Sequence, residues 1–501
     1  MKYFVGLDIG TSQIKAVLFD SSGNEVAVSS HKTEILSPAP KWMEQDMDQI
    51  WDVSAYCLRT LIAHAPCSAE DIIGVGLSGQ GEGLWLIDEK GQPLQNAILW
   101  SDGRSANVIS NLSESDRTAI RRLTFTTPVS ARTLMQLKWM KEHREDVLKQ
   151  ARYCFFCKDW IRYKLTDQLN MDRTDPSVTM LDMNTQEICD PLLTLLGLDG
   201  YRELFPDMIN SSDPAGLITR TASEKTGLPP GIPVAAGALD VTATAIGVNA
   251  MKENDLFLIL GTTACSGLIQ EKSCATVESG KYILHPNSEN WIKIMATMAG
   301  TPNIDWMTLN IACTDNLQHI ESVLVSTSSG SGGIIYLPYI SPAGERYPFY
   351  HPNAMAGFFG ITQSTTREEL VRAVFEGVAM SVKDCLQGET TSGRIHVAGG
   401  GSKNDPWCQI MADCTHHEIV RFRGNEFGAK GAAILGAIGA GWHGSLASLS
   451  KSFCHEDKRF TPNPKNSSLY DDLYGTFKSL QNSQSEIWDS HQKVINAHSL
   501  R

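Results

Sequence analysis

The sequence has no long uncharged hydrophobic run. Its most apolar stretches, such as residues 256–260, are far shorter than the roughly 20 residues that a membrane-spanning helix needs. The chain also starts without the apolar run and small-residue cleavage site of a secretory signal, because strand-like Phe4–Leu7 follows almost at once. We therefore predict a cytoplasmic protein with no membrane partner.

The sequence contains fewer basic than acidic residues. The 501 residues carry 43 Lys and Arg against 56 Asp and Glu, a formal net charge of -13. A protein that binds nucleic-acid backbones needs clustered Lys and Arg, so the sequence predicts no nucleic-acid partner. The balance does not exclude a nucleotide that is held by a few local groups.

Disulfide and zinc patterns are missing as well. The twelve cysteines are scattered, and the one CxxC motif, Cys154–Cys157, has no second pair at zinc-ribbon spacing. Scattered cysteines suit a reducing compartment. We expect this pair to be two small half-buried residues in a strand rather than a metal or redox site.

The glycine-rich segments match neither a P-loop nor a dinucleotide-binding fingerprint. Two of them, Gly399–Ser402 and Gly428–Ala433, stand where a strand is expected to enter a helix. Glycine at such a place lets the backbone approach a nucleotide. The alternative is that each glycine run is a structural turn.

What the sequence does contain is two similar segments. Each consists of a strand, a short Gly-hydroxyl turn and a second strand, with a further apolar strand that ends in glycine downstream. The first covers residues 3–19 and its later strand is 72–79, whereas the second covers 256–269 and its later strand is 395–401. The pattern indicates an internal duplication into two α/β halves.

Apolar residues at helical spacing fill the gaps, for example over residues 46–63 and 367–385. Strands that alternate with helices predict an α/β protein whose mixed sheets are flanked by helices. A chain of 501 residues is also too long for one core. We predict an N-terminal domain at 1–250, a C-terminal domain at 251–445 and a helical tail at 446–501, to which we assign no chemistry.

Asp8 stands inside a strand that is otherwise apolar. A buried carboxylate needs hydrogen bonds or a cation. If the turn at Gly10, Thr11 and Ser12 presents N–H groups and hydroxyls to a phosphate, Asp8 would face the accompanying Mg²⁺. The alternative is a hairpin turn that uses these residues for geometry alone, but the near copy at Gly261-Thr262-Thr263 favours two phosphate-binding turns.

Two further sites stand out. Asp240 ends a run of small residues and precedes a helix built from more small residues, which lets a ligand approach closely. The alternative is an N-cap aspartate. Polar Gln80, Glu82 and Asp102 around the indole of Trp100 are typical of a site for a polyhydroxylated substrate, the alternatives being turn residues and a core tryptophan.

Together these residues resemble the FGGY carbohydrate kinases, within the larger superfamily of sugar kinases, heat-shock proteins and actin. Ala356–Ile361, continued by Glu369–Glu376, is similar to the C-terminal signature of the family. Leu337–Tyr339 and Gly344–Pro348 are similar to its "LPYL…GER.P" segment. The likeness extends from about Tyr3 to Ala440, and it implies a two-domain, actin-like α/β fold with a cleft between the domains.

The resemblance implies a role for each candidate residue. Asp240 would be the general base, and Asp8 would serve the metal. The sugar would be held by Gln80, Glu82, Trp100, Asp102 and Asp240. ATP would be bound by Gly10, Thr11, Ser12, Gly261, Thr262, Thr263, Gly300, Gly400, Gly401 and Ser402.

The implied reaction is in-line transfer of a phosphoryl group from Mg·ATP to a primary hydroxyl of a small sugar. The implied cofactors are ATP and Mg²⁺. Such enzymes are commonly homodimers, so the resemblance implies a homodimer.

Two short stretches depart from the family pattern. D-xylulose kinases carry Met-His where Gly81-Glu82 stands here, and the N-terminal signature has lysine where Gln136 stands. Residues 80–88 look closer to L-xylulose or 3-keto-L-gulonate kinases, although that branch tends to have lysine in place of Glu82. We expect a neutral ketopentose such as L-xylulose. The alternatives are erythritol, glycerol, ribulose or 3-keto-L-gulonate, or a sugar-regulated ATPase that is not a kinase.

Overall fold

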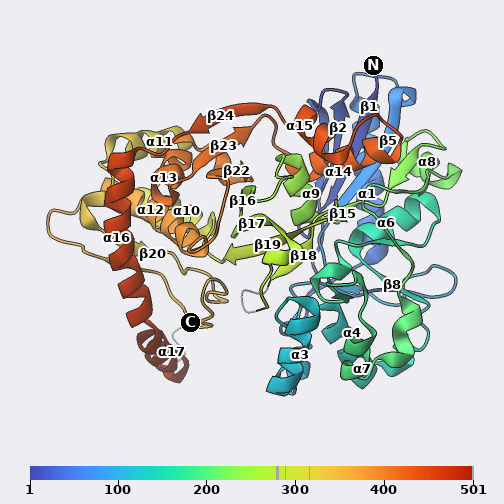
Figure 1. The fold of residues 1–501 in the computed structure, drawn as a ribbon, viewed down its shortest axis with the longest axis horizontal. Coiled ribbons are helices and arrows are strands. Elements are labelled where there is room, and N and C mark those ends of the chain that lie inside the picture. Colours follow the sequence, from blue (N-terminus) through green and yellow to red (C-terminus); the bar gives the residue numbers. More distant parts are fainter. Residues whose placement is uncertain (278–280, 288, 315, 499–501) are drawn as a thin grey trace. The chain divides into compact units, whose positions relative to one another are not determined.

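The computed structural model describes residues 1–277, 281–287, 289–314 and 316–498. The chain packs into two compact units (Figure 1), each assembled from three segments. Unit 1 comprises Met1–Glu253, Ile269–Lys293 and Glu426–His455, and unit 2 comprises Asn254–Leu268, Ile294–Asn425 and Glu456–Arg501. The contiguous boundaries 1–250, 251–445 and 446–501 stay a prediction.

A mixed sheet forms the centre of unit 1. Its strand order is β13-β14-β5-β1-β2-β3, and the short strand β15 also pairs with β5. Strand β1 runs antiparallel to β2 and parallel to β5, so the predicted hairpin and the later strand lie side by side. The strands are β1 (Tyr3–Ile9), β2 (Gln13–Asp20), β3 (Glu25–Lys32), β5 (Ile72–Gly79), β13 (Pro214–Leu217), β14 (Pro233–Ala235) and β15 (Ala238–Leu239).

Helices cover both faces of this sheet, because successive side chains of a strand point to opposite sides. Val5, Leu7 and Ile9 pack with helix α1 (Met47–His64), whereas Phe4 packs with helix α14 (Phe427–Gly439). On the α14 face, α9 (Asp240–Gly247) and α15 (Leu446–Phe453) complete the layer.

Strand β1 and helix α14 touch through their backbones. A Cβ atom added to Gly6 would lie 1.8 Å from the carbonyl oxygen of Ala429, and one on Gly76 would lie 1.8 Å from that of Ala432. On the other side of the helix, a Cβ on Gly431 would lie 1.8 Å from the carbonyl oxygen of Ala243 in α9. The predicted nucleotide approach at Gly431 is therefore wrong, since this glycine serves helix packing.

The rest of unit 1 is a helical region with its own apolar core. Short strands pair locally within it, and β18 pairs with the first half of β19. Its helices are α2 (Ala106–Ser110), α3 (Glu114–Thr124), α4 (Thr133–His143), α5 (Glu145–Leu148) and α7 (Asp190–Leu196). Its strands are β4 (Glu44–Gln45), β6 (Trp85–Ile87), β7 (Ala97–Ile98), β8 (Tyr153–Phe155), β9 (Met171–Asp172), β10 (Leu181–Asp182), β11 (Glu187–Ile188), β12 (Met208–Ile209) and β18 (Tyr282–Leu284). Helices α6 (Cys157–Thr166) and α8 (Arg220–Thr226) instead pack into the core on the α1 face of the first sheet.

Unit 2 repeats the arrangement. Strand β16 runs antiparallel to β17 and parallel to β22, as β1 does with β2 and β5, which is the internal duplication that the sequence predicts. The sheet has the order β19-β17-β16-β22-β23-β24. Its strands are β16 (Leu256–Leu260), β17 (Ala264–Glu271), β19 (Asn290–Thr297), β22 (Arg394–Ala398), β23 (Glu418–Phe422) and β24 (Glu456–Phe460), and a separate pair is β20 (Ile335–Leu337) with β21 (Gly357–Phe359).

The helices of unit 2 enclose its apolar core. The longest predicted one, over residues 367–385, is α12 (Arg367–Cys385), which begins with a capping box between Thr366 and Glu369. The others are α10 (Pro302–Met307), α11 (Leu317–Ser326), α13 (Asp405–Thr415), α16 (Pro464–Ser483) and α17 (Ser485–His498). Within the segment predicted to be helical, β24 adds an edge strand to the sheet.

Helix α16 is anchored by a buried tyrosine. The Tyr470 hydroxyl donates to Glu376 Oε1 (2.7 Å) and accepts from Arg372 Nη2 (3.0 Å). Glu376 also accepts from the Gly330 amide (3.0 Å) and the Ser331 hydroxyl (2.8 Å), so one carboxylate joins α12, α16 and the loop before β20.

Tyr470→Phe removes two of these hydrogen bonds without changing the shape of the side chain. We expect it to lower the free energy of unfolding by about 1–2 kcal/mol, because both partners stay buried. Differential scanning calorimetry of the two proteins measures the change. Tyr56→Phe is the matched control. Tyr56 is 55% exposed, so removal of its hydroxyl should leave Tm unchanged. Equal Tm values for Tyr470→Phe and wild type would contradict the anchoring role.

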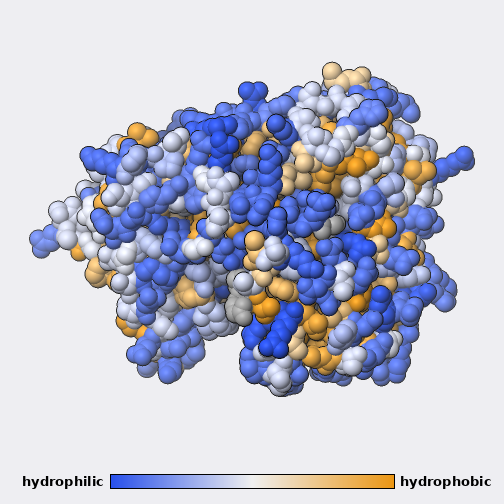
Figure 2. Space-filling model, viewed as in Figure 1, coloured by the Kyte–Doolittle hydropathy of each residue, from blue (hydrophilic) through white to orange (hydrophobic). Residues whose placement is uncertain are grey.

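No helix among the described residues is long and apolar enough to cross a membrane. In the view of Figure 2, hydrophilic residues predominate and hydrophobic ones lie scattered among them. All twelve cysteines are free. Cys154 lies in β8 as predicted, but Cys157 begins helix α6, and both side chains are fully buried rather than half-buried. Burial raises the pKa of the Cys154 thiol to about 12, which keeps it from acting as a thiolate.

Candidate active site

Asp8 lies near the end of β1 and is partly buried. It stands opposite Lys15 in β2 and beside Ser78 in β5, and the Ser78 hydroxyl donates to Asp8 Oδ1 (2.9 Å). Burial raises the pKa of Asp8, and the Ser78 hydrogen bond and the Lys15 charge offset part of this rise. Lys15 itself forms an ion pair with Glu426 (2.7 Å), so its positive charge is shared.

The first turn of α14 comes close to the same carboxylate. A Cβ atom on Gly428 would lie 3.1 Å from Asp8 Oδ2, so only glycine leaves the approach free. Free N–H groups at a helix N-terminus favour negative charge. Sequence reasoning singled out this glycine run but could not tell that Gly428 adjoins Asp8, because the two lie 420 positions apart in the chain (428 − 8).

Asp240 opens helix α9, with Leu239 at the N-cap position, so the N-cap alternative for Asp240 is wrong. Its Oδ1 accepts from the Val241 amide (2.6 Å). Burial raises the pKa of Asp240 to about 7, and the negative charge of Asp8 adds to the rise. Unit 1 therefore brings together two carboxylates that the sequence placed 232 positions apart (240 − 8).

The turn after β1 carries a chain of hydrogen bonds. The Gly10 amide donates to the Gln13 carbonyl (3.1 Å), which closes the turn, and the side chain of Ser12 is exposed. The Thr11 hydroxyl donates to Gln80 Oε1 (2.8 Å) and accepts from Trp100 Nε1 (2.8 Å). Trp100 is 42% exposed, so the alternative of a core tryptophan is wrong and one indole surface remains open.

Glu82 lies in the loop that follows β5. Its backbone has φ 59°, the left-handed region that a non-glycine residue rarely adopts, and its carboxylate forms an ion pair with Arg132 (2.7 Å). Burial raises the pKa of Glu82, and Arg132 offsets part of the rise. The loop abuts Leu239, since a Cβ on Gly81 would lie 2.0 Å from Leu239 Cδ1.

Asp102 is fully engaged by protein groups. Its Oδ1 accepts from the amide and Nε of Arg104, and its Oδ2 accepts from Arg104 Nη2 (2.9 Å) and the Met43 amide (2.6 Å). The guanidinium of Arg104 also pairs with Glu44 (2.7 Å) and lies over the ring of Trp42. These contacts favour a structural role for Asp102, which orients the loop that bears Trp100.

Asp102→Asn should destabilise the fold more than it weakens substrate binding. We expect a loss of at least about 2 kcal/mol in the free energy of unfolding, because the buried Arg104 keeps only Glu44 of its two charged partners. Thermal melting checks this, with KM for the substrate measured on the folded fraction. Asp146→Asn, at an exposed position in α5, is the control. A KM that rises strongly at unchanged Tm would instead assign Asp102 to the substrate.

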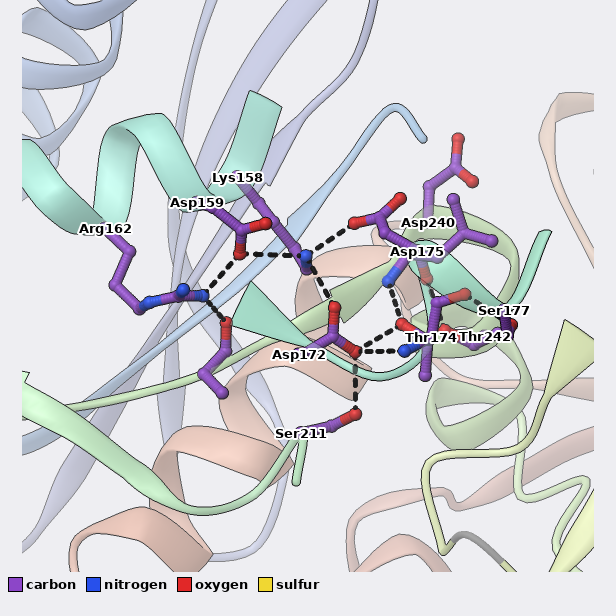
Figure 3. A network of polar contacts seen from close by, with 12 residues as sticks. Lys158, Asp159, Arg162, Asp172, Thr174, Asp175, Ser177, Ser211, Asp240 and Thr242 are labelled. Carbon is purple, nitrogen blue, oxygen red and sulfur yellow. Dashed lines mark hydrogen bonds and ion pairs between the residues drawn. The ribbon is translucent and has the colours of Figure 1, made fainter. Parts of the chain in front are cut away.

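A buried charge cluster lies next to Asp240 (Figure 3). Lys158 contacts three carboxylates, Asp159 (3.0 Å), Asp172 (2.6 Å) and Asp175 (2.5 Å). Burial alone would lower the pKa of Lys158, but these carboxylates raise it. Arg162 forms a further ion pair with Asp159 (2.6 Å), so three carboxyl groups meet two basic groups.

The cluster fixes the backbone just ahead of Asp240. Asp172 Oδ2 accepts from the Thr174 hydroxyl (2.5 Å), and Thr174 Oγ1 in turn accepts from the Leu239 amide (2.9 Å). Sequence reasoning missed this cluster altogether. Isolated Lys and Asp residues are typical of a solvated surface, and only the fold brings them together.

Unit 2 contains the second Gly-hydroxyl turn. The Gly261 amide donates to the Thr263 carbonyl (3.0 Å), and the Gly261 carbonyl accepts from the Thr301 amide (2.7 Å). Gly300 lies directly under this turn, because a Cβ there would be 2.5 Å from the Gly261 carbonyl oxygen. Thr262 is exposed.

The predicted adenine-side loop follows β22 in the same unit. Gly399 has φ 86°, and the Ser402 hydroxyl donates to the Gly399 carbonyl (2.7 Å), which closes a tight turn. Gly400 is exposed and has open space at its Cα, whereas Gly401 and Ser402 are buried.

Glu345, from the predicted GER segment, braces the strand that leads to Gly300. It is fully buried, and it accepts from the Thr297 hydroxyl (2.7 Å) and the Met298 amide (2.9 Å). Burial raises the pKa of Glu345, and these hydrogen bonds offset part of the rise. Within the described residues, Glu345 therefore binds protein groups, which indicates a structural role.

Comparison with known proteins identifies the family to which the two units correspond. Residues 3–247 match the N-terminal domain model of the FGGY family of carbohydrate kinases, and residues 256–440 match its C-terminal domain model. A xylulose kinase from Bacillus subtilis (strain 168) is 27% identical over 96% of this chain and 97% of its own. An L-xylulose/3-keto-L-gulonate kinase from Escherichia coli (strain K12) is 29% identical over 96% of each chain. The crystal structure of a xylulose kinase from Brucella ovis matches with a TM-score of 0.88 at 27% identity, over 97% of this chain and 100% of that one.

Proposed function

Because this chain belongs to the FGGY family of carbohydrate kinases, we propose that it phosphorylates a primary hydroxyl of a small neutral ketopentose, with Asp240 as general base. That it is a carbohydrate kinase, with a two-domain actin-like fold and a sugar or polyol as acceptor, follows from the family itself. The observation that carries the proposed mechanism is the carboxylate of Asp240, whose pKa of about 7 is raised by burial and by Asp8.

A general base works best when its pKa lies near the operating pH. Asp240 accepts one hydrogen bond from the Val241 amide, which orients the carboxylate. It would accept the proton of the sugar hydroxyl as that oxygen attacks phosphorus in line with the leaving group. The hydrogen bond from Leu239 to Thr174 would keep the base in place during the transfer.

The residues around Asp8 fit a magnesium ion. Two neighbouring carboxylates, with Lys15 already paired to Glu426, leave an excess of negative charge. The described residues contain no group of three His, Cys, Asp or Glu side chains arranged to bind a metal. Magnesium commonly uses one or two carboxylates together with substrate phosphates, so Asp8 would be its protein ligand. When bound, the ion neutralises charge on the phosphates.

FGGY kinases use ATP, and we assign its binding to the two glycine turns and their neighbours. Thr11 and Ser12 in unit 1, and Thr262 and Thr263 in unit 2, would donate hydroxyl and amide hydrogen bonds to phosphates. The open backbone at Gly400 leaves room for the nucleotide base. The full proposed set is Gly10, Thr11, Ser12, Gly261, Thr262, Thr263, Gly300, Gly400, Gly401 and Ser402.

The proposed sugar site contains Gln80, Glu82 and Trp100. The exposed indole of Trp100 can cover the C–H surface of a sugar, while the amide and the carboxylate bind its hydroxyls. The favoured acceptor is L-xylulose, with ribulose, erythritol, glycerol and 3-keto-L-gulonate as alternatives. A cytoplasmic location, which the free cysteines suit, and a homodimer belong to the proposal.

The test is ADP formation from Mg·ATP across a panel of pentuloses, polyols, glycerol and sugar acids. One ketopentose that stimulates ADP formation far above the others, with a stoichiometric sugar phosphate, would support the proposal. Slow ADP formation that no member of the panel changes would overturn it.

A further inference from the structure

The ion pair between Glu82 and Arg132 joins two elements of unit 1. Arg132 is the residue before helix α4, and Glu82 lies in the loop after β5. The next residue, Thr133, donates its hydroxyl to the Gly83 carbonyl (2.9 Å), so two adjacent residues of one element hold two adjacent residues of the other. The pair is therefore fixed relative to Gly81, which packs on Leu239 just before Asp240.

This ion pair carries features that stability alone does not explain. The side chains of Arg132 and Glu82 are only 12% and 13% exposed, and burial of two charges costs more desolvation energy than an exposed pair does. The Nε–H of Arg132 is buried and has no hydrogen-bond partner among the described residues. Glu82 also holds a left-handed backbone. Unpaired buried donors and strained backbones are typical of functional sites.

We propose that Arg132 and Glu82 form one recognition element for two neighbouring oxygens of the substrate. The Nε–H of Arg132 donates to one oxygen, a carbonyl or hydroxyl, and the carboxylate of Glu82 accepts from the hydroxyl beside it. Arg132 is thus a further substrate-binding residue. This inference rests on the proposed function and gives a physical reason why neutral ketoses and polyols would be preferred to sugar acids.

The charge of the element carries the selectivity. Glu82 neutralises Arg132, so the pair offers hydrogen bonds without a free positive charge. Asp8 and Asp240 add negative charge in the same unit. A substrate carboxylate would bring another anion into a largely buried place where Glu82 already neutralises Arg132, which is costly. A neutral pair of oxygens meets no such penalty.

Three variants separate the two functions of the pair. Glu82→Gln frees the charge of Arg132 at nearly constant shape. We expect the ratio of kcat/KM for a C6 sugar acid to kcat/KM for the best neutral sugar to rise at least 10-fold. Arg132→Gln removes the donor, and we expect KM for the neutral sugar to rise at least 10-fold with a smaller change in kcat. Arg132→Lys keeps the charge but lacks Nε–H, so KM should remain high.

Folding is checked by Tm and circular dichroism, and the double variant Glu82→Gln/Arg132→Met removes both buried charges if a single variant unfolds. A wild-type enzyme that prefers a sugar acid, or a Glu82→Gln variant with unchanged selectivity, would overturn the inference and leave the kinase intact. Absence of turnover with every compound would overturn the proposed function instead. In that case, calorimetric titration of the same sugars without nucleotide tests whether Arg132 and Glu82 bind the substrate. Equal affinities of wild type and Arg132→Gln for the sugar would overturn the inference.

Discussion

Asp240→Asn should lose at least about 10³-fold in kcat while the protein stays folded. The amide has nearly the shape of the carboxylate and can still accept the hydrogen bond from the Val241 amide, but it cannot take a proton. General-base catalysis commonly contributes 10²–10⁴-fold to the rate, and the base acts here on an alcohol of high pKa. Coupled ADP assays under saturating sugar and Mg·ATP measure the loss.

The same substitution should stabilise the metal-free protein at neutral and alkaline pH. Burial and Asp8 raise the pKa of Asp240 from its ordinary value of 3.8 to about 7 in the folded state. Ionisation therefore favours unfolding, and the stability that Asp240 contributes is present below pH 4 and lost as the pH rises to about 7. The Tm advantage of Asp240→Asn should grow across this window and then level off.

Thermal melts from pH 4 to pH 9 in the presence of a chelator test this prediction. Asp52→Asn is the control, because the Asp52 side chain is 72% exposed and its substitution should leave the pH profile unchanged. A variant that is inactive but shows the wild-type pH profile of Tm would disprove the buried, raised-pKa state. A variant that is active would disprove the general base.

Gly6→Ala should have the largest effect on folding. Its methyl group would have to occupy the place of the Ala429 carbonyl oxygen, 1.8 Å from the ideal Cβ position. Neither partner is a flexible side chain, so the sheet and α14 must separate along their whole contact. We expect a loss of at least about 3 kcal/mol in the free energy of unfolding, at the upper end of what overpacking costs. Guanidinium denaturation measures it.

Gly475→Ala is the matched control in a helix. Gly475 lies within α16, and apart from the backbone of its own helix no described atom lies within 4 Å of an added Cβ. We expect a gain of about 0.5–1 kcal/mol, since alanine is the better helix former. If Gly6→Ala is as stable as Gly475→Ala, the close packing of β1 on α14 is wrong.

Local patterns predicted the elements of the fold well. The helix over residues 367–385 has these bounds in the structure, and the strand over 72–79 does too. These segments have strong apolar periodicity, which local sequence carries. The repeated strand pattern of the two sheets followed from the two Gly-hydroxyl hairpins and the strands after them.

Contacts between distant residues were harder to predict. Lys158 and Asp172 have the sequence appearance of surface charges, and nothing local shows that they are buried together. Asp102 stays a predicted sugar ligand, because a carboxylate beside the indole of Trp100 is typical of a sugar site. Its pairing with Arg104 could not be predicted, since it depends on how the loop folds back. The role of Arg132 could not be predicted, since a lone arginine before a helix belongs to no motif with a distinctive spacing.

Unit 1 is assembled from three separate segments of the chain, and this affects when it can fold during synthesis. About 180 residues separate the end of α9 at Gly247 from the start of α14 at Phe427. At ribosomal rates of roughly 5–20 residues per second, the sheet face at Phe4 and Gly6 waits on the order of 10 to 40 s for the helix that covers it. Unit 1 therefore completes its folding only near the end of synthesis, and the apolar sheet face of its first half stays uncovered until α14 has been made.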